Sequence, residues 1–160
     1  MKKILLMTML LGGALAARSE ELAWLTDAAK AQAQAKAEKK LVLLDFTGSD
    51  WCGWCIRLNK EVFSKPEFAE YAKKNLVLVE VDFPNKKKLS NEQQTANREL
   101  EKKYAVRGYP TIILLDGNGK KVGQLSYADG VEDFEHADRK TLSAKPSTFI
   151  AAIEKQKQGR

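Results

Sequence analysis

Residues 41–58 read LVLLDFTGSDWCGWCIRL, and this stretch decides the fold. It begins with a continuous apolar run at residues 41–46, which predicts a strand buried on both faces, as in a parallel sheet. Both cysteines of the chain, Cys52 and Cys55, follow directly. Apolar residues then recur at steps of three and four, so a helix is expected to begin near the cysteines. The stretch therefore predicts a buried strand and a helix with a cysteine pair at their junction.

The rest of the chain alternates the same two kinds of element. Apolar runs predict further strands at residues 76–83, 111–115 and 121–127. Helical spacing predicts helices at residues 19–40, 64–74, 90–104 and 147–158. A strand–helix–strand order with a long crossover gives a parallel pair, and a Gly-Asn-Gly turn joins the last two strands as a hairpin. We expect an α/β fold: a mixed central sheet of about four strands with helices on both faces, plus an extra N-terminal helix.

The N-terminus has the pattern of a secretory signal peptide. Lys2 and Lys3 precede an apolar stretch at residues 4–17, which ends in the small residues typical of a cleavage site. The stretch is shorter than the ~20 residues that a membrane-spanning helix needs, so a membrane anchor is the less favoured alternative. We expect residues 1–17 to be a signal peptide and residues 18–160 to form one domain that is periplasmic or secreted.

Composition limits the classes of function. With 160 residues, 44% of them hydrophobic and 30% charged, the chain has the make-up of one globular domain with its own core. The formal net charge is +6, but the basic residues are scattered and form one run, at residues 86–88. This distribution indicates a solvated surface, and we expect no nucleic-acid partner.

Three kinds of site could use two cysteines at this spacing. A structural disulfide would close almost no loop and would therefore stabilise the fold little. A zinc site needs about four ligands, and the chain offers two cysteines and the single His136, which lies in a polar segment. A redox couple is favoured over both, because thiols outside the cytosol are oxidised unless a reductant acts on them.

The position of the cysteines suggests a role for each. The start of a helix presents unpaired N–H groups and the positive end of the dipole, which stabilise a thiolate and lower its pKa. Cys52 is therefore the expected nucleophile, and Cys55, one helical turn later, is expected to resolve the mixed disulfide. This chemistry needs no metal and no dissociable cofactor.

These motifs together resemble the thioredoxin family. WCGWC after LVLLDF, GYPT at residues 108–111 and the Gly-Asn-Gly turn are similar to the thioredoxin-like fold, and longer stretches resemble secreted bacterial proteins of the thiol:disulfide interchange type. The resemblance is good over residues 40–127 and looser in the last helix, so the core of the domain is expected at about 40–158. It implies that Pro110 is cis and lies beside the cysteines, where the backbone of Tyr109 can pair with an extended substrate.

The resemblance also implies roles for residues around the cysteines. Trp51 is expected to shield one side of the site, and the dipeptide Gly53-Trp54 is expected to tune the redox potential. Because this dipeptide contains no histidine to stabilise the thiolate of Cys52, we expect a moderately to strongly reducing couple.

Proton transfer is the part of the site where the sequence departs from the family. Asp45 matches the buried carboxylate that moves a proton to or from the resolving cysteine in thioredoxins, but the loop before the cysteines is one residue longer here. Asp50 is therefore a second candidate, and a plain strand-end role for Asp45 stays open. If Asp82 aligns with the strand-end aspartate of the family, Leu78 occupies the position of the usual partner lysine.

The expected function is that of a thiol–disulfide oxidoreductase that reduces or exchanges disulfides in extracytoplasmic proteins. Its partners would be cysteine-containing protein substrates and a membrane thiol reductase as electron donor, and the protein is expected to be a monomer. Two alternatives stay open: a disulfide isomerase, and a non-catalytic binding module that keeps the fold.

Overall fold

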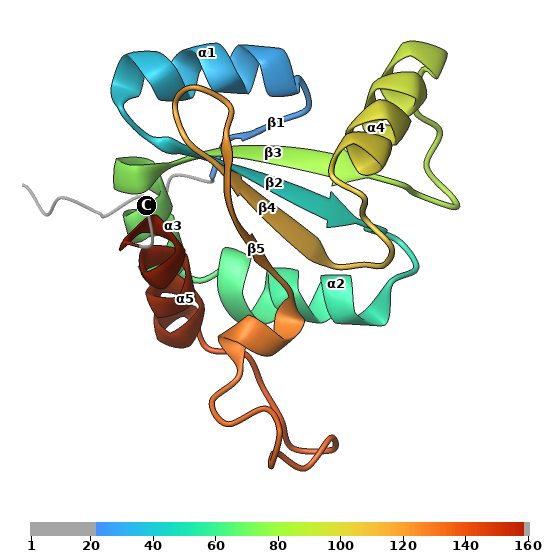
Figure 1. Cartoon of the computed structure of the whole chain (residues 1–160). Coiled ribbons are helices and arrows are strands. Elements are labelled where there is room, and N and C mark those ends of the chain that lie inside the picture. Colours follow the sequence, from blue (N-terminus) through green and yellow to red (C-terminus); the bar gives the residue numbers. More distant parts are fainter. Residues whose placement is uncertain (1–21, 159–160) are drawn as a thin grey trace, which may run out of the picture.

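The computed structural model describes residues 22–158, so the predicted signal peptide at residues 1–17 lies outside the described part. The domain has three layers, with a central sheet between two groups of helices (Figure 1). The strands are β1 (Trp24–Leu25), β2 (Leu41–Thr47), β3 (Leu76–Asp82), β4 (Thr111–Leu115) and β5 (Lys121–Leu125). The helices are α1 (Ala28–Glu38), α2 (Gly53–Leu58), α3 (Pro66–Asn75), α4 (Asn91–Lys103) and α5 (Pro146–Gln158). A π-helical turn, η1 (Asn59–Phe63), continues α2, and a 3-10 turn, η2 (Tyr127–Gly130), follows β5.

The sheet is mixed, as predicted, and its strand order is β1-β3-β2-β4-β5. β2 and β3 are parallel, and the crossover between them contains α2 and α3. β4 runs antiparallel to both β2 and β5, which confirms the expected hairpin. α1 and α4 cover one face of the sheet, while α2, α3 and α5 cover the other (Figure 1). The short strand β1 is an addition to the four strands expected from the sequence.

Of the helix predicted over residues 19–40, residues 19–21 lie outside the described part, and the prediction is wrong for residues 22–27. Trp24 and Leu25 form β1, which pairs in parallel with β3, and the helix begins only after Asp27. The Asp27 carboxylate accepts hydrogen bonds from the next helical N–H groups, at Ala29 (2.9 Å) and Lys30 (3.0 Å). Aspartate is a strong N-cap because its side chain satisfies N–H groups that the helix leaves unpaired.

The two faces of β2 contribute to two separate clusters of the core. Leu41 and Leu43 pack with side chains of α2, α3 and α5, whereas Val42 and Leu44 pack against α1. All of β2 is buried, as its unbroken apolar run predicted. On the face toward α2, Leu41 and Leu43 are followed by the polar residues Asp45 and Thr47 at the carboxyl end of the strand. Polar side chains therefore lie beneath the start of α2.

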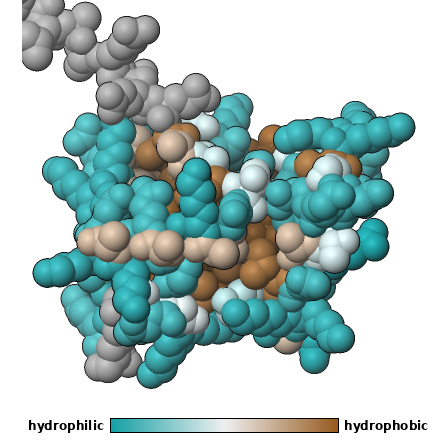
Figure 2. Space-filling model, turned by 90° about the horizontal axis from the view of Figure 1, so that it is seen from above, coloured by the Kyte–Doolittle hydropathy of each residue, from teal (hydrophilic) through white to brown (hydrophobic). Residues whose placement is uncertain are grey.

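The outer surface over α1 and α4 is mostly hydrophilic, with apolar atoms visible in a hollow between these helices (Figure 2). Of the helices in residues 22–158, none combines the length and the apolar character needed to cross a membrane.

Candidate active site

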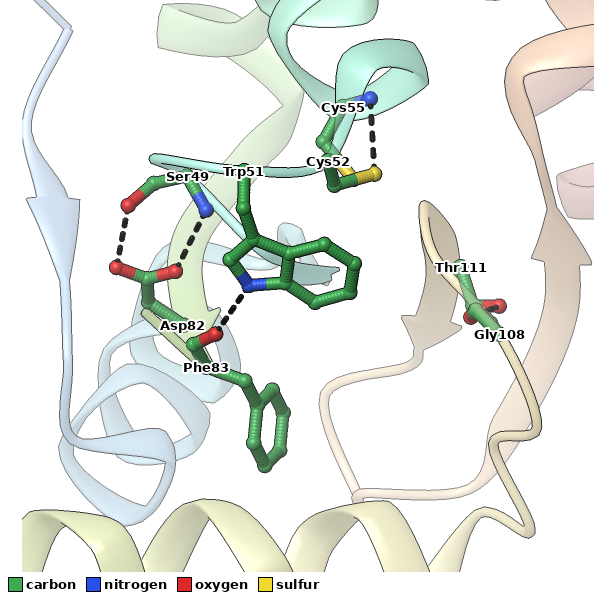
Figure 3. The surroundings of a disulfide bond; sticks show 8 residues. All are labelled: Ser49, Trp51, Cys52, Cys55, Asp82, Phe83, Gly108 and Thr111. Atoms are coloured by element: carbon green, nitrogen blue, oxygen red, sulfur yellow. Dashed lines mark hydrogen bonds between the residues drawn. A yellow bond between two sulfur atoms is a disulfide. The ribbon is translucent and has the colours of Figure 1, made fainter. Parts of the chain in front are cut away.

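The two cysteines lie at the start of α2 and form a disulfide, with an S–S distance of 2.10 Å. Cys52 is the N-cap residue, and its sulfur accepts a hydrogen bond from the N–H of Cys55 at 3.2 Å (Figure 3). Both residues are buried. The predicted helix start is thus confirmed, and a backbone N–H of the first turn points at the sulfur of Cys52, where it would stabilise a thiolate.

The longer loop before the cysteines is tied to the end of β3. Ser49 donates from its N–H (2.9 Å) and from its hydroxyl (2.6 Å) to the Asp82 carboxylate. The indole N–H of Trp51 donates to the carbonyl oxygen of Phe83 at 2.7 Å, and Figure 3 shows these bonds on one side of the disulfide. Trp51 keeps 46% of its surface exposed, so its ring forms part of the outer surface beside the cysteines.

Asp50, the second candidate for proton transfer, instead holds a neighbouring loop. Its carboxylate accepts hydrogen bonds from the backbone N–H groups of Asn85 (2.9 Å), Lys86 (2.7 Å) and Lys87 (3.1 Å). These bonds, with that from Asn85 the largest influence, lower the pKa of Asp50. A carboxylate held in this way stays ionised and supports the loop after β3, which leaves Asp45 as the candidate for proton transfer.

Asp45 is buried near the end of β2, and its Oδ1 has no hydrogen-bond partner within the protein. It lines a cavity of about 630 Å³ together with Cys55. Burial, followed by the charges of Glu80 and Asp82, raises the pKa of Asp45 to about 8. Asp45 therefore keeps its proton at neutral pH, although a carboxylic acid in water would lose it.

The strand register shows which residue stands opposite Asp45. Its partner on β3 is Glu80, whereas Leu78 pairs with Leu43. The site therefore has a second carboxylate beside the first. Sequence reasoning missed Glu80, and the signal that could have found it is the single charge inside the apolar run of residues 76–81.

The loop before β4 lies across from the disulfide (Figure 3). The Tyr109–Pro110 bond is cis, as the resemblance implies, and the Thr111 hydroxyl donates to the carbonyl oxygen of Gly108 at 2.7 Å. The Tyr109 ring stacks on Phe83 with a centroid distance of 5.3 Å.

The hydroxyl of Tyr109 donates to the Glu101 carboxylate on α4. Burial and this bond raise the pKa of Tyr109. Both ends of the side chain are therefore held, and the ring supports the Pro110 loop from the side of α4. Glu101 was not foreseen from the sequence, because only the tertiary fold brings α4 next to this loop.

Trp54 lies between the two cysteines, and its large side chain is 43% exposed. Its ring packs on Tyr127 at a centroid distance of 4.9 Å. With Pro110 and Phe134, these two rings line a shallow hollow of about 230 Å³. Gly53, by contrast, has open space where a side chain would begin. An apolar surface formed in part by Trp54 thus adjoins the disulfide.

Arg57 connects this surface to the framework. Its guanidinium lies 5.2 Å from the Trp54 ring centre and 5.3 Å from that of Tyr127, and it donates to Glu61 (3.0 and 3.1 Å) and to the carbonyl oxygen of Leu142 (2.5 Å). The other carboxylate oxygen of Glu61 accepts from the Tyr127 hydroxyl at 2.6 Å. Sequence reasoning missed this network, since Arg57 and Glu61 look like an ordinary i, i+4 surface pair.

No group of three or more histidine, cysteine or acidic side chains within residues 22–158 is arranged to hold a metal ion. His136 is exposed in the polar loop, as expected, and contacts Asp133 at 2.6 Å. His136 is therefore a surface residue.

A disulfide at the start of a helix, a preceding central strand and a facing cis-proline loop define the thioredoxin-like class. Comparison with known proteins agrees: a family model described as a thioredoxin-like domain matches residues 28–138. The chain belongs to this family.

Three relatives illustrate the similarity. The disulfide bond reductase DsbH of Chlamydia pneumoniae is 38% identical over 102 residues, which cover 64% of this chain and 61% of that protein. The thioredoxin-related protein DsbJ of the same organism is 29% identical over 65% of this chain and 30% of its own length. A solved structure of a DsbH oxidoreductase superposes with a TM-score of 0.71 and 28% identity, covering all of this chain and 96% of the other. The matched region thus spans less than two thirds of each of the two curated relatives.

Proposed function

We propose that this chain is a thiol–disulfide oxidoreductase that reduces or exchanges disulfides in extracytoplasmic proteins. The observation that carries the proposal is the Cys52–Cys55 disulfide at the start of α2, with the sulfur of Cys52 accepting the Cys55 N–H. The similarity to a protein named as a disulfide bond reductase supports the direction of the reaction. A disulfide used only as a staple would need none of the polar apparatus around it.

The proposed mechanism uses the two cysteines in sequence. In the reduced protein the thiolate of Cys52 attacks a client disulfide, and a mixed disulfide forms while one client sulfur leaves as a thiolate. Cys55 then loses its proton and attacks the sulfur of Cys52. The internal disulfide re-forms, and the second client sulfur leaves with the electron pair. The helix start stabilises the Cys52 thiolate, which makes it both the attacking group and a good leaving group.

Asp45 is the proposed proton carrier for Cys55. Both residues line the same cavity, and Asp45 lacks a hydrogen-bond partner in the protein on Oδ1. Because burial keeps Asp45 protonated at neutral pH in the oxidised state, it can donate to Cys55 when the internal disulfide is opened. In the reverse direction its carboxylate accepts the proton that Cys55 gives up.

The surface around the disulfide is the proposed place for the client. The Tyr109 backbone at the Pro110 loop would pair with an extended client segment, in the manner of strand addition. The exposed rings of Trp51 and Trp54, the neighbours of Cys52 and Cys55 in the chain, border the site. An apolar rim of this kind suits cysteine-containing segments that are unfolded or mobile.

The cellular setting is part of the proposal. The apolar N-terminal stretch at residues 4–17 supports export, so the protein would act in the periplasm or outside the cell. There its disulfide would be reduced by a membrane thiol reductase, and it would act as a monomer. A disulfide isomerase or a non-catalytic module are the rival functions.

Reduction of insulin by dithiothreitol tests the proposal. We expect the protein to accelerate insulin reduction and Cys52→Ser to abolish the acceleration. Cys55→Ser should instead trap clients as mixed disulfides on Cys52, which mass spectrometry can identify. No acceleration by the intact protein would favour the binding module, and full activity of Cys52→Ser would contradict the nucleophile assignment. Recovery of scrambled ribonuclease faster than insulin reduction would favour the isomerase.

A further inference from the structure

We propose that Glu80 is a second proton carrier of the active site, which passes protons between Asp45 and the water of the cavity beneath α2. This inference rests on the proposed function, and it concerns how the proton that Cys55 needs enters and leaves a buried site. Glu80 acts through Asp45 and has no direct contact with the sulfur atoms.

The register of the central strands places the two carboxyl groups side by side. Asp45 on β2 pairs with Glu80 on β3, and Thr47 pairs with Asp82. Paired residues of neighbouring strands point to the same face of a sheet. Since Leu43 lies on the face covered by α2, α3 and α5, Asp45 and Glu80 lie on that face as well. The sheet therefore presents its polar pairs directly beneath the helix that carries the cysteines.

A single cavity joins the groups that the proposal connects. Asp45, Glu80 and Cys55 all line the cavity of about 630 Å³. Asp45 is 8% exposed, whereas Glu80 is only half-buried. A cavity of this size and polarity can hold several waters, which carry protons between groups that do not touch. Glu80 thus gives the pair a side chain that is in partial contact with solvent.

The charged groups around the pair favour one shared proton. The Asp82 carboxylate is engaged by Ser49, and Lys65 lines the same cavity. Burial and the Asp82 charge raise the pKa of Glu80, while Lys87 acts in the opposite direction. The ion pairs found among residues 22–158 do not include Asp45 or Glu80. Two neighbouring carboxylates that have no ion-paired cation among residues 22–158 resist ionising together, so the pair holds a proton near neutral pH.

Reduction of the Cys52–Cys55 disulfide by a thiol donor returns the protein to its active form, and this reaction requires a proton. A donor thiolate attacks the sulfur of Cys52 and forms a mixed disulfide with it, while the internal S–S bond breaks and the sulfur of Cys55 leaves with the electron pair. A second donor thiolate then breaks the mixed disulfide, so the donor is oxidised to a disulfide and Cys52 leaves as a thiolate. Asp45 gives its proton to the sulfur of Cys55, and the resulting Asp45 carboxylate takes a proton from Glu80 or from cavity water that Glu80 serves. When the protein reduces a client, the same path carries the proton from Cys55 outward.

Single-turnover reduction of the oxidised protein by dithiothreitol, followed between pH 5 and pH 9, tests the proposal. Glu80→Gln keeps the shape of the side chain but cannot exchange a proton, and Glu99→Gln on the exposed surface of α4 is the matched control. We expect Glu80→Gln to slow the reaction about tenfold at pH 7, which is modest for loss of a proton carrier, and to move its pH midpoint downward. Glu99→Gln should leave both unchanged. Equal rates and pH profiles for the two variants would overturn the proposal.

A measurement on the unmutated protein keeps the proposal testable if Glu80→Gln does not fold. Carbon NMR of the side-chain carboxyl groups in the oxidised protein should show Asp45 and Glu80 titrating in two coupled steps. Independent single-step titrations of these groups would contradict the shared proton. The first experiment follows the protein's own disulfide and the second follows its carboxyl groups. Neither needs a client, so their failure can be told apart from failure of the proposed activity in the insulin assay.

Discussion

The indole N–H of Trp51 donates a 2.7 Å hydrogen bond to the backbone carbonyl of Phe83, the first residue after β3. This bond connects the loop before the cysteines to a neighbouring strand end. The Trp51 ring also meets Tyr109 edge-on, with ring centres 6.0 Å apart. The tryptophan is therefore fixed in place although nearly half of its surface is exposed. It acts as a brace between the cysteine loop and the Pro110 loop.

Gly48→Ala should disturb this brace. A Cβ atom at Gly48 would lie 2.4 Å from the Trp51 ring, and the ring cannot yield without losing its bond to Phe83. We expect a loss of about 1–3 kcal/mol in the free energy of unfolding and slower insulin reduction. Gly53→Ala is the control, since a Cβ there meets nothing within 4 Å. Urea unfolding of the two variants decides the matter, and equal stability would show that Trp51 is not held as described.

Glu61→Gln should release the surface beside Trp54. Each Glu61 oxygen is engaged, one by Arg57 and the other by the Tyr127 hydroxyl and the Ala144 N–H. An amide can accept on one atom only, so we expect a loss of about 1–3 kcal/mol in the free energy of unfolding.

The hydrogen bonds to Glu61 also predict that the stability of the wild-type protein depends on pH. Burial acts to raise the pKa of Glu61, but the bonds from Tyr127, Ala144 and Arg57 outweigh it and lower the pKa overall. This contribution to stability is present above the pKa of the unfolded chain, about 4.3, and is lost as the pH falls through the lowered folded value. The difference between wild type and Glu61→Gln in urea unfolding should therefore shrink toward pH 3. A difference that grows on acidification would contradict the network.

Asp50→Ala should affect the loop after β3 and leave proton transfer unchanged. The Asp50 carboxylate accepts from three backbone N–H groups of residues 85–87. We expect faster hydrogen exchange at these amides, while the pH profile of the dithiothreitol reaction keeps its wild-type midpoint. A shifted midpoint would return Asp50 to the list of proton carriers. Asp45→Asn, measured alongside, should shift the profile.

Asp45→Asn should also change how stability depends on pH. The folded-state pKa of Asp45 is about 8 and the unfolded value is about 3.9, so between these values the native state binds one more proton. Wild-type stability should therefore fall as the pH rises, by up to about 1.4 kcal/mol per pH unit.

The asparagine variant lacks this proton and should lose the dependence. We expect Asp45→Asn to gain several kcal/mol over wild type at pH 8 and to differ little at pH 4. Guanidinium unfolding of the oxidised proteins at the two pH values measures this, with Glu99→Gln as control. A variant that is equally stable or less stable at pH 8 would show that Asp45 is ionised in the native state.

The redox potential should lie on the reducing side. The dipeptide Gly53-Trp54 contains no histidine or other charged residue that could stabilise the Cys52 thiolate in addition to the helix start. Equilibration with glutathione buffers, read by thiol alkylation, should give a potential clearly below the about −120 mV of the strongest oxidants. A value near that figure would mean that a further group in the protein stabilises the thiolate and would contradict this prediction.

Several strands and helices could be predicted from the sequence because the pattern that specifies them lies within the element itself. β4 has the predicted bounds, residues 111–115, and β2 has the predicted unbroken burial. The helix start at Cys52 followed from the apolar spacing after it. β1 escaped prediction because two residues carry no periodic pattern, and Trp24 and Leu25 form a strand only through pairing with β3.

The sequence by itself determined the class of fold and the cysteine pair. Strand burial, helix spacing and the distance between Cys52 and Cys55 depend on residues close together in the chain. Only the tertiary structure decided that Glu80 faces Asp45, that Asp50 supports a loop, and that Arg57 contacts Tyr127 and Leu142. These contacts join residues from separate elements, and their register is set by how the whole core packs. A shift of one residue between β2 and β3 would turn every side chain of the shifted strand to the opposite face, which no local pattern at either position reveals.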